Sequence, residues 1–346
     1  LDVTVPKAGR AYLKITYRLL EGTPLVPAGH ILGFDEILLA NEDGRNQTAL
    51  RWLNQERDAD GAVGVTETDG EVILKGKGFV YVYNKKRGLF DSMNYGGREY
   101  LDSPMELNIW RAPTDNDMYV KHEWHKARYR QACPRAYVTV VELSKDGGVI
   151  TSTLSVSAAS LQPVMKVKAV WTVDNNGGIN STLDVVRNEE FPELPRFGVR
   201  LFLNRKLENV SYYGYGPMES YCDKHRAASH GLYRAKVTDL HEDYIRQQEN
   251  GSRFDCDYVE VCNGQFGLAA VSEQRFSFNA SVYTQEELEE KDHNFELEES
   301  GSTVLCLDYA LNGIGSNSCG PKVLERYRFD NGTFCFRFKL VPFAKV

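Results

Sequence analysis

Short stretches in which apolar and polar residues alternate recur along this chain, and they constrain its fold more than any other feature. Between Ala11 and Leu19, apolar residues occupy every second position, which is typical of a β-strand with one buried face. Turn residues, such as the run from Asp174 to Gly178, separate such stretches from one another. Further alternating or apolar stretches occur at 72–74, 79–83, 164–173, 179–186 and 196–203. The pattern predicts an all-β chain.

The end of the sequence predicts a hairpin, and helical signals are few. Tyr327 and Phe329 precede Asn331-Gly332, a pair that favours a type I′ turn, and alternating residues follow at 334–340. Residues 123–130 are expected to form a short helix. Thr284 stands three residues before Glu287, which is the spacing of a capping box at the start of a second helix.

Three segments are expected along the chain. Residues 1–42 contain two or three strands, and a sheet this small cannot bury both of its faces alone. Residues 43–65 are predicted to be a polar linker, and residues 66–346 a single large antiparallel β-sandwich. The first residue is Leu1 rather than Met, so we expect further chain upstream.

Charge and cysteine usage argue against several classes of protein. The net charge of −7 and the pI of 5.6 do not suit a nucleic-acid partner, which needs a basic face. No apolar run reaches the roughly 20 residues of a membrane span. The seven cysteines lack zinc-ligand spacing, and the histidines His122 and His125 are one residue too close for a zincin helix. No metal ligands are therefore predicted in this chain.

The segment Asn108–Asp117 combines aromatic, basic, acidic and amide side chains within ten residues. Pro113 lacks a backbone donor and drives Ala112 toward extended geometry, and the acidic and amide residues that follow favour turns. The segment is therefore predicted to be a loop. Such a loop either holds itself together, with Arg111 paired to a carboxylate and Trp110 against the core, or contributes to a ligand site.

Four motifs, in this order, resemble those of a known family. They are the segments Trp110–Asp117, Tyr212–Lys224, Tyr244–Arg253 and Gly313–Pro321, the last of which reads Gly-Ile-Gly-Ser-Asn-Ser-Cys-Gly-Pro. Together they resemble the C-terminal region of family 2 glycoside hydrolases of the β-galactosidase type. The chain departs from that family's pattern at Tyr215, Ser220, Lys224 and Gln247.

The resemblance implies a fold and a set of site residues. The fold is a large antiparallel β-supersandwich of the galactose mutarotase-like kind, preceded by the last strands of an immunoglobulin-like domain. A substrate-binding rim at the mouth of the active site is implied for Asp115, Asn116, Asp117, Met118, Ser316, Asn317 and Cys319. Some relatives have Trp at the place of Cys319, where it stacks on the leaving-group side of the substrate. The remaining motif residues are expected to be mainly structural: Trp110, Arg111, Glu219, Asp223, Arg246, Glu249 and Arg253.

The resemblance also implies a function that this chain performs together with upstream domains. Retaining glycosidases use two carboxyl groups about 5 Å apart. In this family both carboxyl groups belong to glutamates of an upstream α/β-barrel. Such a barrel needs alternating strands and helices, a pattern that this chain does not show. The chain is therefore expected to belong to a β-galactosidase and to be inactive alone. Mg²⁺, with Na⁺ as a further candidate, is expected in the barrel. The expected partners are a β-galactoside or oligosaccharide and the upstream domains, with no nucleic acid and no membrane, in the cytoplasm or periplasm of a bacterium.

Two other functions remain open from the residues alone. Aromatic-rich loops also suit a free-standing carbohydrate-binding module, which packs aromatic faces on sugar rings. An aldose mutarotase is a second alternative, because that enzyme uses a Glu and His pair and the chain offers His225, His230 and His241. It is the weaker one, since analogy of fold says little about function. The exact galactoside, a related glycosidase such as a glucuronidase, and the oligomeric state are also left open.

Overall fold

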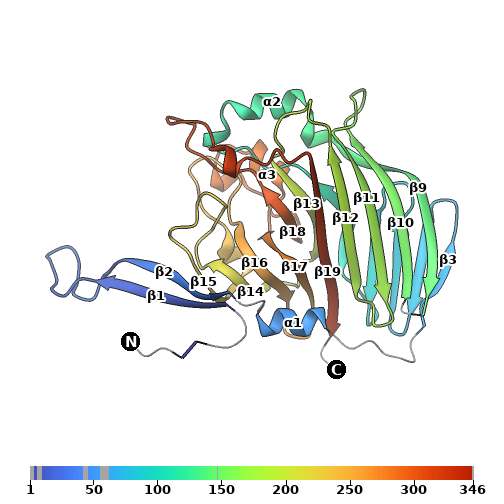
Figure 1. The fold of residues 1–346 in the computed structure, drawn as a ribbon, viewed down its shortest axis with the longest axis horizontal. Coiled ribbons are helices and arrows are strands. Elements are labelled where there is room, and N and C mark those ends of the chain that lie inside the picture. The colour runs from blue at the N-terminus through green and yellow to red at the C-terminus, as the bar shows by residue number, and fades with distance from the viewer. Residues whose placement is uncertain (1–3, 6–9, 42–45, 55–61, 146, 345–346) are drawn as a thin grey trace. The chain divides into compact units, whose positions relative to one another are not determined.

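The computed structural model describes residues 4–5, 10–41, 46–54, 62–145 and 147–344 (Figure 1). The chain divides into two compact units, residues 1–51 and 52–346. In the first unit, strands β1 (Arg10–Arg18) and β2 (Ile31–Asn41) pair as an antiparallel sheet. The predicted linker, 43–65, contains helix α1 (Gln47–Leu53), and its residues 43–45 and 55–61 lie outside the described part. The domain boundaries and the immunoglobulin-like assignment stay predictions.

A twelve-stranded antiparallel sheet forms most of the second unit. Its main path runs β15-β14-β16-β17-β19-β12-β11-β10-β9, and strands β13, β18 and β8 extend it off that path. Their bounds are β8 (Leu101–Asn108), β9 (Cys133–Ser144), β10 (Gly147–Ser157), β11 (Met165–Asp174), β12 (Ile179–Arg187), β13 (Arg196–Asn204), β14 (Asn209–Gly216), β15 (Ser229–Lys236), β16 (Arg253–Cys262), β17 (Phe266–Ser281), β18 (Ser302–Leu311) and β19 (Thr333–Ala344).

Strand β17 is the place where this sheet divides. Its first residues, from Phe266 to Val271, pair with β19, whereas its last residues, from Ser277 to Ser281, pair with β18. Strand β16 lies along its other edge. One long strand therefore belongs to two branches of the sheet, and the second branch continues through β18 to β13 and β8.

A five-stranded sheet covers the β9 to β12 region of the large one. It consists of β3 (Gly64–Glu67), β4 (Glu71–Gly76), β5 (Phe79–Asn84), β6 (Leu89–Tyr95) and β7 (Arg98–Glu99), in that order. The rings of Phe90 and Trp171 meet edge to face at 5.4 Å between the two sheets, and the Tyr83 hydroxyl contacts the Ser152 hydroxyl at 2.8 Å. Strand β5 alternates buried and half-buried residues along its whole length, as the sequence pattern indicates. The predicted all-β antiparallel sandwich is confirmed.

The two predicted helices exist with shifted bounds. Helix α2 spans Val120–Lys126 and helix α3 spans Gln285–Glu290, and both lie toward the same end of the strands (Figure 1). The Thr284 hydroxyl accepts the backbone N–H of Glu287 at 3.1 Å, which is one half of the expected capping box. The Glu287 carboxylate accepts the backbone N–H of Glu298. None of the described helices has the length and apolar character needed to cross a membrane.

The predicted C-terminal hairpin is wrong. Tyr327 ends a 3₁₀ turn (Glu325–Tyr327), and Phe329 is buried, with its carbonyl accepting the backbone N–H of Leu194. The alternating strand beyond Gly332 exists, as β19, but it pairs with β12 and β17 rather than with the segment just before it. A period of two identifies a strand and its buried face, and it does not identify the strand's neighbours.

Candidate functional site

The loop that follows β8 folds around one buried ion pair. Arg111 has no exposed surface, and its Nε and Nη2 atoms donate to the two carboxylate oxygens of Asp117 at 3.2 and 2.8 Å. The backbone N–H of Thr114 also donates to Asp117, at 2.9 Å. A planar guanidinium matches a carboxylate in this bidentate way, so the pair fixes the turn at Asp115–Asp117, which is a 3₁₀ helix.

Asp117 thus lies in a different place from the other predicted rim residues. It is 1% exposed, and both of its carboxylate oxygens already accept hydrogen bonds from Arg111. Its neighbours Asp115 and Met118 are exposed. Asp117 therefore shapes the loop, and Asp115 and Met118 are left at the surface.

Three side chains hold the loop at 312–319, which contains the predicted rim residues Ser316, Asn317 and Cys319. Arg111 donates to the carbonyls of Asn312 and Gly313 at 2.6 and 3.2 Å. The carboxylate of Asp223 accepts the backbone N–H groups of the next two residues, 314 and 315, at 2.9 and 2.7 Å. Asn116 donates to the following carbonyl, that of residue 315, at 2.7 Å, and accepts the Ser318 hydroxyl at 2.8 Å. The structure therefore brings together three motifs, in which bonded residues lie as many as 202 positions apart in the sequence.

The surface of these two joined loops carries most of the predicted rim residues. Ser316 and Cys319 are exposed, and Asn116 and Asn317 are half-buried. The Asp115 carboxylate accepts the side-chain N–H of Gln248 at 3.2 Å. Hydroxyl, amide and carboxylate groups of this kind form hydrogen bonds with sugar hydroxyls. Among the described residues of the two loops, Asp115 carries the one exposed carboxylate. We define the rim as Asp115, Asn116, Met118, Ser316, Asn317 and Cys319.

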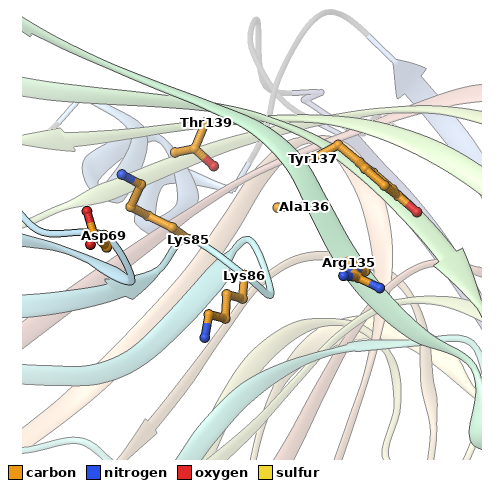
Figure 2. Close-up of a pocket in the computed structure, with 7 residues that line it drawn as sticks. All are labelled: Asp69, Lys85, Lys86, Arg135, Ala136, Tyr137 and Thr139. Carbon is orange, nitrogen blue, oxygen red and sulfur yellow. The ribbon is translucent and has the colours of Figure 1, made fainter.

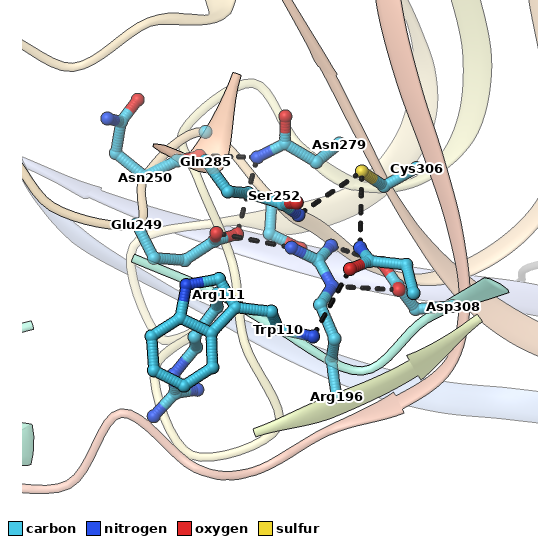
Figure 3. A network of polar contacts seen from close by, with 12 residues as sticks. Trp110, Arg111, Arg196, Glu249, Asn250, Ser252, Asn279, Gln285, Cys306 and Asp308 are labelled. Carbon is cyan, nitrogen blue, oxygen red and sulfur yellow. Dashed lines mark hydrogen bonds and ion pairs between the residues drawn. The ribbon is translucent and has the colours of Figure 1, made fainter. Parts of the chain in front are cut away.

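A buried polar network lies next to the first loop, at Trp110 and Arg111 (Figure 3). Arg196 is fully buried and donates to both oxygens of Asp308 at 2.9 and 2.5 Å, and to Glu249 at 3.2 Å. Asn279 also donates to Glu249, at 3.4 Å. Burial raises the pKa values of Glu249 and Asp308, although the charge of Arg196 opposes the rise. The backbone N–H of Glu249 donates to the carbonyl of Ala112 at 3.1 Å, so this network also supports the first loop.

The remaining motif residues fall into two groups. Trp110 is buried, and its indole N–H donates to Glu289 of α3 at 3.0 Å. Arg253 is buried and donates to the Tyr212 hydroxyl at 3.1 Å and to the carbonyl of Gly251 at 2.9 Å. Arg246 differs, because it is largely exposed and lies 3.7 Å from an exposed carboxylate, Asp292.

Glu219 is the centre of a smaller polar cluster. Its carboxylate accepts the Lys224 ammonium at 2.5 Å, the Tyr244 hydroxyl, and the backbone N–H of Gly251 at 2.9 Å. Burial raises the pKa of Glu219, but these hydrogen bonds outweigh that effect and lower the pKa from its usual value of 4.5. The carboxylate is therefore held in its ionised form.

Several residues that complete these networks were missed from the sequence. Arg196 and Asp308 lie inside strands β13 and β18, where charged residues at inward positions are masked by the hydrophobic pattern around them. Gln248, which contacts Asp115, occupies the third motif but was not singled out. Within the described residues, no three His, Cys, Asp or Glu side chains converge as a possible metal site.

Comparisons with known proteins give one consistent family. The family model described as "Beta galactosidase small chain" matches residues 75–340. The β-galactosidase of Actinobacillus pleuropneumoniae is 37% identical over 343 residues, which are 99% of this chain and 33% of that protein. The β-galactosidase of Staphylococcus xylosus is 36% identical over 311 residues, which are 89% of this chain and 30% of that protein. The chain thus spans about a third of the length of these curated relatives.

Solved structures with similar folds include two proteins of lactobacilli. The galactose 1-epimerase from Lactobacillus acidophilus NCFM matches with a TM-score of 0.47 and 10% identity, over 84% of this chain and 99% of that chain. A galactose mutarotase-like protein from Lactobacillus casei ATCC 334 matches with a TM-score of 0.40 and 8% identity, over 81% of this chain and 99% of that chain.

Proposed function

We propose, because this chain belongs to the β-galactosidase small chain family, that it forms the C-terminal β-sandwich of a retaining family 2 β-galactosidase. Its rim shapes the aglycone side of an active site whose two catalytic glutamates lie in an upstream barrel of the same polypeptide. The complete enzyme hydrolyses terminal β-D-galactosides. In this proposal Mg²⁺, with Na⁺ as a further candidate, binds in the barrel and not to residues of this chain.

The joining of the two rim loops is the observation that carries this proposal. Arg111, Asn116 and Asp223 hold the loop at 312–319 through five hydrogen bonds to its backbone. All three side chains are buried or half-buried, and they come from two separate segments of the chain. A loop held this tightly presents its side chains in fixed positions, as a substrate-binding surface requires.

The chemistry of the rim suits a contributing surface. Its side chains offer hydroxyl and amide groups for sugar hydroxyls, and Met118 adds an adaptable apolar contact. Retaining hydrolysis needs two carboxyl groups about 5 Å apart, and the rim supplies Asp115 alone. The proposed division of labour therefore gives substrate positioning to this chain and bond cleavage to the barrel.

A chimera tests the proposal. The matching third of the A. pleuropneumoniae β-galactosidase is replaced by this chain, and hydrolysis of an aryl β-galactoside is measured for the chimera and for the chain alone. We expect turnover by the chimera and none by the chain. Turnover by the chain alone that a rim substitution abolishes would overturn the assignment of catalysis to the barrel.

A rim substitution in the chimera then tests the aglycone side. Cys319→Trp adds an aromatic face to the rim, so we expect the KM for an aryl galactoside to fall by about twofold to tenfold, with kcat nearly unchanged. Cys133→Trp, at another exposed cysteine on β9, is the matched control. Equal effects of the two substitutions, or no effect of Cys319→Trp, would contradict the rim role.

A further inference from the structure

A pocket of about 400 Å³ lies beside the Glu219 cluster. Its wall is formed by two segments, residues 218–227 after β14 and residues 242–244 before β16. This volume falls in the range of about 300–1,000 Å³ that is usual for small-molecule sites. The pocket is therefore large enough to hold a ligand of the size of a monosaccharide or disaccharide.

The floor of the pocket is fixed before any ligand enters. Lys224 donates to Glu219 at 2.5 Å and to the Tyr244 hydroxyl at 2.8 Å, and the Tyr244 hydroxyl also contacts Glu219. The side chain of Glu219 is only 6% exposed. A carboxylate, an ammonium and a phenol thus form a small rigid set, which needs little ordering when a ligand binds.

Two charged groups on the wall are not engaged in a side-chain hydrogen bond or ion pair within the described residues. They are the Arg226 guanidinium and the Glu242 carboxylate. Burial and the negative charge of Glu219 raise the pKa of Glu242, although the charges of Arg253 and Lys224 oppose the rise. The Arg226 side chain is exposed and Glu242 is half-buried, so both groups can exchange bound water for the hydroxyl groups of a ligand.

The balance of charge around the pocket limits the chemistry of that ligand. Glu219, Asp223 and Glu242 are acidic, and Lys224 and Arg226 are basic. The opposite charges largely offset one another, so the lining strongly attracts neither a simple anion nor a simple cation. A neutral molecule with many hydroxyl groups satisfies both sets, because each hydroxyl both donates and accepts.

The pocket also offers apolar surface for the carbon side of such a molecule. Met218 is 49% exposed, and it lines the pocket together with the ring of Tyr244 and the methyl group of Ala227. Apolar walls with a few fixed polar groups are typical of small-molecule sites, and aromatic faces pack against the C–H faces of sugar rings.

We propose that this pocket is a binding site for a neutral saccharide, which Arg226 and Glu242 hold through its hydroxyl groups. The fixed set of Glu219, Lys224 and Tyr244 forms its floor. Asp223 lies in the wall and also holds the rim loop through residues 314 and 315, so it is left unchanged in the test below.

Calorimetric titration of the chain with galactose and with lactose tests the site, with Arg226→Gln and Glu242→Gln as the informative variants. We expect saturable binding of at least one of the two sugars, and about tenfold weaker binding in each variant, since a hydrogen bond to a charged group contributes this much. Circular dichroism checks that both variants fold.

Matched controls come from another pocket, of about 480 Å³, between the turn after β5 and the edge strand β9 (Figure 2). Arg135→Gln and Asp69→Asn change an arginine and a carboxylate of that pocket and should leave sugar binding unchanged. Asn317→Ala, at the rim, should also leave it unchanged, which separates this site from the rim proposal. The site is refuted if neither sugar binds, if Arg226→Gln and Glu242→Gln bind like the parent, or if the controls weaken binding equally.

Discussion

Replacing Arg111 by methionine should destabilise the second unit strongly. The change leaves the Asp117 carboxylate buried without its cation and removes the donor from two backbone carbonyls, those of Asn312 and Gly313. Removing one partner of a buried ion pair costs about 3–5 kcal/mol, because the other charge stays buried and unpaired. We therefore expect the free energy of unfolding to fall by about that amount, and Asp117→Asn to have a comparable effect.

Urea unfolding followed by tryptophan fluorescence measures this loss. All four tryptophans lie in residues 52–346, so the signal reports on the second unit, and Trp124 lies 5.2 Å from the Arg111 guanidinium. The free energy follows from the midpoint and the slope of the transition. The matched control is Arg205→Met, which removes an exposed ion pair with Glu299 and should cost about 0–1 kcal/mol.

The double variant Arg111→Met/Asp117→Asn decides whether the pair itself is responsible. Because both charges are removed together, its loss should fall short of the sum of the single losses by about 0.5–3 kcal/mol. Additive losses, or a loss for Arg111→Met no greater than for Arg205→Met, would refute the reasoning. An Asp117→Asn variant of unchanged stability would return Asp117 to the rim.

Two further predictions concern pH and strand packing. The hydrogen bonds that lower the pKa of Glu219 below 4.5 stabilise the fold above about pH 5, and this stabilisation is lost as the pH falls through the lowered pKa. Urea midpoints measured between about pH 5 and 3 should therefore fall less steeply for Glu219→Gln than for the parent. Equal slopes for the two proteins would contradict this. In Gly198→Ala, the new methyl group would lie 1.9 Å from a backbone carbonyl of β18, so we expect a loss above about 4 kcal/mol in thermal or urea unfolding. Gly70→Ala, with nothing within 4 Å, is the control, and similar stabilities of the two variants would show that β13 and β18 yield to the methyl group.

The sequence predicted the loops of the site better than the support behind them. Arg111 and its acidic neighbours stand out because Pro113 and the turn residues forbid regular structure there. Asp308 does not stand out, since it lies in an apolar strand between Leu307 and Tyr309, and nothing local indicates that Arg196, over 100 residues earlier, faces it. Buried ion pairs across a sheet depend on register, which a single sequence does not contain.

The assignment of Asp117 shows a second limit. Asp115, Asn116 and Asp117 are adjacent and chemically alike in the sequence, and a motif treats them as one unit. The 3₁₀ turn points them in different directions: Asp115 is exposed, Asn116 holds the neighbouring loop and Asp117 is buried. Local composition predicted a polar loop, and only the backbone conformation separates the inward side chain from the outward ones.

The place of β19 in the large sheet has a consequence for biosynthesis. Among the described strands it comes last in chain order, yet it lies between β17 and β12. A ribosome therefore finishes all other strands of the sheet while β12 and β17 still have open edges facing the missing one. Unpaired apolar edges are templates for aggregation, and pairings between distant segments form slowly. The nascent chain must therefore stay soluble while the β9 to β12 part of the sheet and the part that contains β17 are not yet paired through β19. Pairing becomes possible when residues 333–344 emerge.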